Sequence, residues 1–287
     1  MISHHRTDSS LNINHPQAPK MAVIDLPARY ELRIVPEEHL DWIRAVMCFA
    51  FIHRTKLWTA LVPEDERTAL TYGAYLGCEG LALHMIKSGK TLAVYDKEYA
   101  FKRPGSAAQG GKLWWDVEDK AANRDKLAEQ MDFPLVHLAA AYDQFERPSP
   151  EAMSSAVGSL PPMGHAFGAL GSRDPRSLEE SMATALGQNL SRVATVTQEG
   201  YEGQKLMRLT AQYMMRKSAE EGFRAINISA FSDAVFHIWS NPPEPFKAKE
   251  ICHLDYYDYE ETADNGTTSF PFRPADFRAT KLVIELR

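Results

Sequence analysis

The clearest periodic pattern of apolar and polar positions lies in residues 189–236. A short apolar run at residues 193–196 predicts a strand, and a loop that carries Gly and Glu follows at residues 198–203. From Leu206 to Gly222 apolar residues recur at helical spacing, and the glycine stands where a helix would end. Residues 225–230 alternate Ile with polar neighbours, which predicts a second strand. The segment therefore predicts the order strand, loop, helix, strand.

The rest of the chain carries further strand and helix patterns. The predicted elements are strand 30–35, helix 39–51, helix 63–89, strand 91–101, strand 112–117, helix 232–239, strand 250–259 and strand 279–286. Gly77 and Gly80 leave the continuity of the second helix open. The strands at 91–101 and 112–117 predict a hairpin with a broad loop.

The strand, loop, helix, strand segment resembles the central motif of the GCN5-related N-acetyltransferases, the GNAT family. In that family the loop has the pattern Arg/Gln-x-x-Gly-x-Gly/Ala, and its amides and the helix N-terminus hold the pyrophosphate of acetyl-CoA. The segments AVFHIWSNPP and ATKLVIEL near the C-terminus resemble a fungal branch of the family. The resemblance implies an α/β fold with a mixed, mainly antiparallel twisted sheet and flanking helices.

The same resemblance implies acetyl-CoA, or another acyl-CoA, as the cofactor. The residues that it implies for cofactor binding are Thr195, Val196, Thr197, Gly200, Tyr201, Glu202, Gly203, Gln204 and Lys205. The loop departs from the family pattern, because Glu202, Lys205 and Met207 fall on its three signature positions. Glu202 would lie near a pyrophosphate, which is electrostatically unfavourable, and Lys205 offsets part of this charge.

Residues 26–287 are predicted to form a single GNAT-like domain after a disordered tail at residues 1–25. Residues 118–188 do not belong to a minimal member of the family and predict a large helical insertion. Its helices are predicted at residues 119–131, 134–145, from Ser149 onward and 178–186, with a loop at 158–171. An insertion of this length forms a lid, a pocket wall or an interface.

Proton transfer in this family uses a base for the amine and a Tyr that protonates the thiolate. Counting from Ser232, the position of this Tyr falls on Trp239, whose indole cannot act as a general acid. Asp233 and His237 lie four residues apart on one helical face, so that Asp233 can orient His237 as the acid or base. The same spacing also fits a pair that stabilises the helix. Glu199 is a further candidate base, or a solvated loop charge.

Four residues are predicted for the substrate pocket. They are Trp115, His165, Trp239 and Tyr257. Trp114 and Trp115 would point to opposite faces of a strand, so that one joins the core. His165 lies between glycines in the predicted loop, as a lid residue would. The Cys252-His253-x-Asp255 segment has the wrong spacing for a metal site on one face of a strand, so we predict none.

Composition narrows the function classes. The chain has 287 residues, of which 44% are hydrophobic and 24% charged, with a net charge of −6 and no basic patch. Nucleic acid and anionic membrane are therefore not expected as partners. Three cysteines cannot form a disulfide framework, and no apolar run reaches transmembrane length. These features predict a soluble cytoplasmic protein of small-molecule metabolism.

Three functions fit these observations. The first is acyl-CoA-dependent N-acetyl transfer to a small amine. The second is a biosynthetic enzyme of the same fold that no longer uses acetyl-CoA and carries out decarboxylase or cyclase chemistry. The third is a non-catalytic binding module, with residues 118–188 as an interface and a homodimer as the open alternative.

Overall fold

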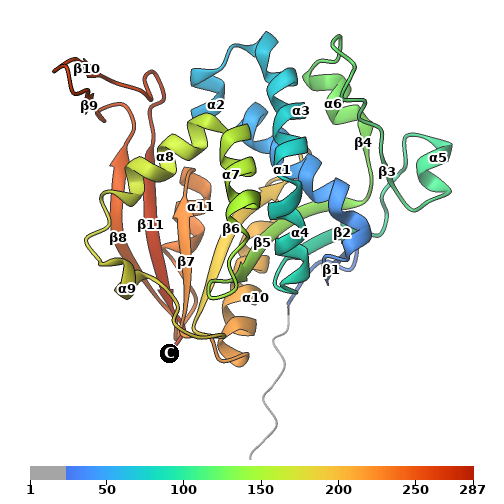
Figure 1. The fold of residues 1–287 in the computed structure, drawn as a ribbon. Coiled ribbons are helices and arrows are strands. Elements are labelled where there is room, and N and C mark those ends of the chain that lie inside the picture. The colour runs from blue at the N-terminus through green and yellow to red at the C-terminus, as the bar shows by residue number, and fades with distance from the viewer. Residues whose placement is uncertain (1–23) are drawn as a thin grey trace, which may run out of the picture.

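The computed structural model describes residues 24–287, which surround a seven-stranded sheet (Figure 1). The predicted tail at residues 1–25 lies almost entirely outside this range. In sheet order the strands are β1 (Tyr30–Ile34), β2 (Leu92–Asp96), β5 (Leu135–Asp143), β6 (Asn189–Thr197), β7 (Ala225–Ala230), β11 (Arg278–Glu285) and β8 (Lys247–Asp255). Neighbouring strands are antiparallel except β6 and β7, which are parallel. The predicted mixed, mainly antiparallel sheet is confirmed.

Helices cover both faces of the sheet (Figure 1). One face carries α1 (Leu40–Arg54), α3 (Arg67–Gly77), α4 (Glu79–Lys87), α7 (Pro150–Ser159) and α8 (Pro161–Gly171). The other face carries α10 (Leu206–Glu220) and α11 (Asp233–Trp239). Shorter elements are η1 (Glu37–His39), α2 (Lys56–Leu61), η2 (Glu64–Glu66), α5 (Pro104–Ala107), β3 (Lys112–Leu113), α6 (Arg124–Gln130), β4 (Met131–Asp132), α9 (Leu178–Ser181), β9 (Glu261–Thr262) and β10 (Thr268–Ser269).

The central motif follows from local sequence signals, and its predicted order is confirmed. α10 ends at Glu220, and Gly222 follows its C-cap with a φ of 96°, in the left-handed region that glycine tolerates. The N–H of Phe223 returns to the carbonyl of Ser218 at 3.0 Å, which satisfies one of the last helical carbonyls. α11 begins after Ser232, whose side chain accepts a hydrogen bond from the N–H of Val235.

The largest difference from the sequence prediction concerns residues 134–145. They were expected to be a helix, and they form β5, which lies in the middle of the sheet between β2 and β6. Eight of the nine residues of this strand are buried. A strand buried on both faces has no alternation of apolar and polar positions, and its alanines favour a helix by propensity. Tertiary pairing overrides both signals here.

Two further predictions were wrong in the same part of the chain. Residues 158–171 were expected to be a loop, but most of them form α8, because Pro161 and Pro162 occupy the first helical turn, where proline is tolerated. The expected hairpin of strands 91–101 and 112–117 is also absent among the described residues. β2 pairs with β1 and β5 instead, and β3 pairs with β4.

Candidate active site

The sheet opens in its middle, between β6 and β7. Their parallel pairing covers only Asn189–Arg192 against Ala225–Ile228. Arg192 and Ala194 pair with consecutive residues of β5, so Val193 is an extra residue that forms a β-bulge. A bulge bends its strand and increases the local twist. Beyond it the two parallel strands separate, and the edge of β6 that faces β7 has no strand partner.

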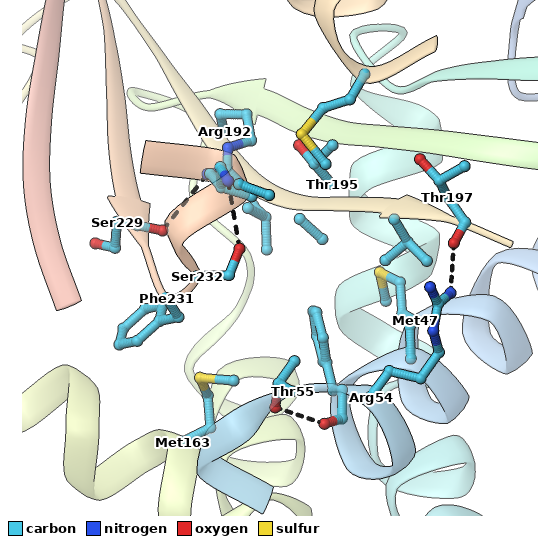
Figure 2. Close-up of a pocket in the computed structure, with 18 of the residues that line it drawn as sticks. Met47, Arg54, Thr55, Met163, Arg192, Thr195, Thr197, Ser229, Phe231 and Ser232 are labelled. Atoms are coloured by element: carbon cyan, nitrogen blue, oxygen red, sulfur yellow. Dashed lines mark hydrogen bonds between the residues drawn. The ribbon is translucent and has the colours of Figure 1, made fainter. Parts of the chain in front are cut away.

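A cavity of about 1200 Å³ lies at this opening (Figure 2). Its walls come from β6, the loop after β6, the first turns of α10 and α11, and the facing sides of α1, α7 and α8. Its large apolar lining residues include Met47, Phe51, Met153, Val157, Met163, Phe167, Phe231 and Phe277. Pockets of about 300–1,000 Å³ are usual for drug-sized ligands, so this cavity has room for a larger molecule.

The loop between β6 and α10 is fixed to the neighbouring strands. The hydroxyl of Tyr201 donates to Asp96 Oδ2 at 2.9 Å, and the hydroxyl of Tyr30 donates to the side-chain oxygen of Gln204. Gly200 and Gly203 have φ values of 86° and 75°, which allow the chain to turn sharply into the helix. The loop is therefore held in one conformation before any ligand binds.

A row of unpaired backbone amides lies at the start of α10. Within residues 24–287, the N–H groups of residues 203–208 have no hydrogen-bond partner. Successive free amides at the positive end of a 15-residue helix form an anion site. Residues 203–208 also line the cavity, so the anion site and the opened sheet belong to one space.

The charged side chains around this loop are predominantly basic. Arg54 donates to the carbonyl of Thr197 at 2.6 Å (Figure 2). It also forms an ion pair with Glu202. Glu202 also accepts the N–H of Gly200 at 2.8 Å. Within the described part of the chain Lys205 and Arg208 have no ion-pair partner, and both are exposed at the first turn of α10. The cavity mouth is therefore suited to an anionic group.

Sequence comparison alone does not place this chain, since no family model and no curated protein matches it. Solved structures do match. The C-terminal condensation domain of Ebony, in complex with beta-alanyl-dopamine, has a TM-score of 0.57 at 15% identity and covers 89% of this chain and 98% of its own. Arylalkylamine N-acetyltransferase 2 from Aedes aegypti has a TM-score of 0.54 at 11% identity, with coverages of 90% and 99%. The chain has the GNAT fold. Neither structure supports a fungal branch.

In this GNAT fold the residues proposed for cofactor binding gather in one place. Eight of the nine line the cavity: Thr195, Val196, Thr197, Tyr201, Glu202, Gly203, Gln204 and Lys205. The ninth, Gly200, lies in the same loop outside the lining. Met207, which falls on the Gly or Ala position of the family pattern, also lines the cavity.

The proposed catalytic residues divide into two groups. His237 and Asp233 are exposed on α11 and line the cavity. Within residues 24–287 no hydrogen bond joins them, and Lys56 Nζ lies 3.2 Å from Asp233 Oδ2 instead. Glu199 lies outside the cavity lining and pairs with Arg124 at 2.6 Å. His237 therefore lines the cavity without a hydrogen bond to Asp233.

The four residues expected in the substrate pocket lie elsewhere in the described chain, outside the lining of the cavity. Trp115 is half-buried and donates to the carbonyl of Leu127 at 2.9 Å. His165 Nε2 lies 2.6 Å from the carboxylate of Glu261, on the outer side of α8.

The positions of the other two expected pocket residues, Trp239 and Tyr257, depend on which way each side chain faces. Trp239 is fully buried in the core beneath α10 and α11, because it lies on the sheet-facing side of α11. Tyr257 is 47% exposed and lies under the guanidinium of Arg273. Sequence spacing alone does not reveal which way these two side chains face.

Three residues of the site were not predicted. Arg54 ends α1, Tyr142 is the penultimate residue of β5 and Arg192 lies on β6, and all three line the cavity. Burial raises the pKa of the Tyr142 phenol, which therefore stays protonated at neutral pH. Arg192 carried a signal in the sequence, because it is the one charged residue among the buried positions of β6, which are otherwise Leu190, Ala194 and Val196.

The described residues contain no cluster of three or more His, Cys, Asp or Glu side chains that could bind a metal. Among residues 24–287 there is also no helix with the length and apolar character needed to span a bilayer.

Proposed function

We propose that this protein is an acyltransferase that moves an acyl group from a CoA thioester to a small amine with an apolar body. The observation that carries the proposal is the row of unpaired amides at residues 203–208, which opens into the same cavity as the separated strands β6 and β7. The free strand edge offers hydrogen bonds to an extended chain, and the amides offer them to phosphate.

The residues present fit the phosphate groups of CoA. Lys205 and Arg208 supply exposed positive charge beside the amides, and Arg54 neutralises Glu202, the one acid of the loop that lines the cavity. The hydrogen bonds of Tyr201 and Gln204 fix the loop, so little ordering is needed on binding. When bound, the thioester supplies the activated acyl group. The chain's own residues bind it, orient it and exclude water.

The apolar side of the cavity suits the body of the amine. α7 and α8 present Met153, Val157, Met163 and Phe167 to it, and α1 adds Phe51. Methionine side chains adapt to irregular ligand shapes, and aromatic side chains stack on rings. The two solved structures described above carry the names of amines with aromatic rings, arylalkylamine and beta-alanyl-dopamine. An amine of this class is therefore the acceptor that we propose.

Two side chains of the cavity can move protons. We assign His237 the role of accepting a proton from the amine, because its exposed ring can pass the proton to solvent. We assign Tyr142 the role of donating a proton to the departing sulfur, because its half-buried phenol has a raised pKa and stays protonated at neutral pH. Trp239 has neither role, since it lies in the core on the other side of α11.

Calorimetric titration with CoA and acetyl-CoA tests the proposal. We expect micromolar binding, about −8 kcal/mol. Gly203→Ala should weaken it about tenfold or more, because alanine is strained at a φ of 75°. The matched control is Gly266→Ala, which introduces the same strain at a φ of 80° in the turn between β9 and β10. The proposal fails if the folded wild-type protein binds neither compound.

One observation favours a second function. Glu202 places a carboxylate inside the phosphate loop and occupies the N–H of Gly200. An enzyme that no longer uses acetyl-CoA, with decarboxylase or cyclase chemistry in the same cavity, would tolerate this acid. In that case Glu202→Gln should create CoA binding that the wild-type protein lacks, and His237→Ala should abolish turnover that is independent of CoA.

A further inference from the structure

Arg192 lies at the point where β6 and β7 separate. It is the last residue of β6 that pairs with β7, opposite Ile228, and the bulge at Val193 follows it directly. Its side chain belongs to the lining of the cavity, yet the residue is only 5% exposed (Figure 2). A guanidinium is thus buried at the closed end of the opening.

Few protein groups compensate this charge. One amino group of Arg192 donates to the carbonyl of Ser229 at 3.5 Å, which is a long hydrogen bond, and Nε has no partner within the described residues. The ring of Trp239 lies 5.7 Å from the guanidinium carbon. Burial lowers the pKa of Arg192 to about 9, which still leaves it charged at neutral pH.

The carboxylates of the cavity do not pair with Arg192. Glu202 pairs with Arg54 and Asp233 with Lys56, and among residues 24–287 no acidic side chain forms an ion pair with Arg192. A buried charge without a counter-charge is costly, and is retained where a ligand or partner supplies the opposite charge. The remaining donors of its planar fork match a carboxylate, which can accept two of them at once.

The phosphate site cannot supply this anion. Thr197, where the loop begins, lies five positions beyond Arg192 on β6, which is roughly 17 Å along an extended strand. The cavity therefore has one basic region at its mouth and a second, buried cation at its closed end, with apolar walls between them.

We infer that Arg192 binds a carboxylate carried by the reacting part of the ligand, at the junction of β6 and β7. This inference deepens the proposed function and rests on it for the choice of thioester. The carboxylate belongs either to the acyl group, as in succinyl-CoA, or to the amine, as in an aromatic amino acid. Both sources place an anion beyond the reacting atoms, at the end of the cavity opposite the phosphates.

Matched ligand pairs test the inference by calorimetry. Succinyl-CoA is compared with acetyl-CoA, and phenylalanine with phenethylamine in the presence of CoA. In at least one pair the carboxylate member should bind more tightly to the wild-type protein. Arg192→Gln should weaken that member roughly 30-fold or more and leave the neutral member unchanged, because it removes the partner of a buried charge. The pair that responds identifies the source of the carboxylate.

The control variant is Arg216→Gln, which makes the same chemical change at an exposed position of α10 and should leave both pairs unaffected. Arg192→Lys keeps the charge without the planar fork, so it should retain part of the preference if Arg192→Gln fails to fold. Equal affinities in the wild-type protein within both of these pairs and within the third pair described next would overturn the inference, and this comparison needs no variant.

A third pair separates failure of this inference from failure of the proposed function. 4-Phenylbutyrate and 4-phenylbutyramide are titrated without CoA. Binding of the acid that depends on Arg192 would support the carboxylate site even if no CoA thioester binds. Tight binding of CoA with no carboxylate preference in any of the three pairs would leave the proposed function standing and remove the role of Arg192.

Discussion

At the scale of single residues, Lys205 connects backbone strain with the candidate site. Among residues 24–287 it is the only non-glycine residue with a positive φ, at 63°, and it directly precedes α10. A left-handed conformation costs a side-chain-bearing residue on the order of 1–3 kcal/mol and is found mainly at functional positions. The strain at Lys205 therefore coincides with the row of free amides that we assign to phosphate binding.

Two substitutions at this position separate strain from charge. Lys205→Gly should raise the free energy of unfolding by about 1 kcal/mol, because glycine adopts this conformation without a steric cost. Lys205→Ala keeps the strain and should give no such gain. Both variants remove a cation and should weaken CoA binding by a similar, modest factor. Urea unfolding and calorimetry measure the two effects, and equal stabilities of the two variants would contradict the assignment of strain.

At the scale of secondary-structure elements, close packing between α3 and α7 places the apolar wall of the cavity. A Cβ added at Gly77 of α3 would lie 2.4 Å from Ser159 Cβ of α7, so only glycine allows this approach. The same helix holds Gly73, where an added Cβ would meet nothing within 4 Å. α7 in turn presents Met153 and Val157 to the cavity. The position of this wall therefore depends on small residues at a helix contact.

The two glycines of α3 form a matched pair for a test. Gly77→Ala should lower the free energy of unfolding by about 1–3 kcal/mol through overpacking. Gly73→Ala should raise it by up to about 1 kcal/mol, because alanine favours a helix and the position is open. Chemical denaturation distinguishes the signs. If both substitutions stabilised the protein, α7 would have to shift at little cost, and the contact with Gly77 would not fix the position of the apolar wall of the cavity.

The sequence predicted those elements whose signals are local. α10 follows from helical spacing and Gly222, and α11 corresponds to the helix predicted at residues 232–239. β5 was not predicted because complete burial removes alternation, and α8 was not predicted because its glycines and prolines resemble a loop. In the same way the sequence located the loop that we propose for phosphate binding, whose amides need only a strand, a turn and a helix. It did not reveal the position of Arg192 at the strand junction, which depends on long-range pairing.

At the scale of the whole molecule, buried histidines make stability depend on pH. Burial lowers the pKa of His137 in β5 to about 3 and that of His53 in α1 to about 4. Both stay neutral in the folded protein while the unfolded chain takes up protons near pH 6.5. Their contribution to the free energy of unfolding is complete above pH 6.5. It is lost as the pH falls toward the pKa values of the folded state, because the unfolded state then binds more protons.

Urea unfolding at pH 7 and pH 5 measures this dependence. Each histidine should contribute a loss of about 2 kcal/mol over this interval, since one proton corresponds to about 1.4 kcal/mol per pH unit below pH 6.5. His137→Gln keeps a hydrogen-bonding group opposite Thr197 and should remove about half of the combined loss. An unchanged pH dependence in this variant would show that His137 is protonated in the folded state.

The parallel junction of β6 and β7 also bears on how the binding site comes into existence. Antiparallel pairing joins β1, β2, β5 and β6 into one block and β7, β11 and β8 into another, while four residue pairs join the blocks to each other. The cavity takes one wall from each block, with Thr195 on the first and Ser229 on the second. Neither block holds the site by itself, so a nascent chain that has completed the first block still has nowhere to bind its ligand. Binding competence arises only when the two blocks dock, and a ligand that spans the junction then holds them together.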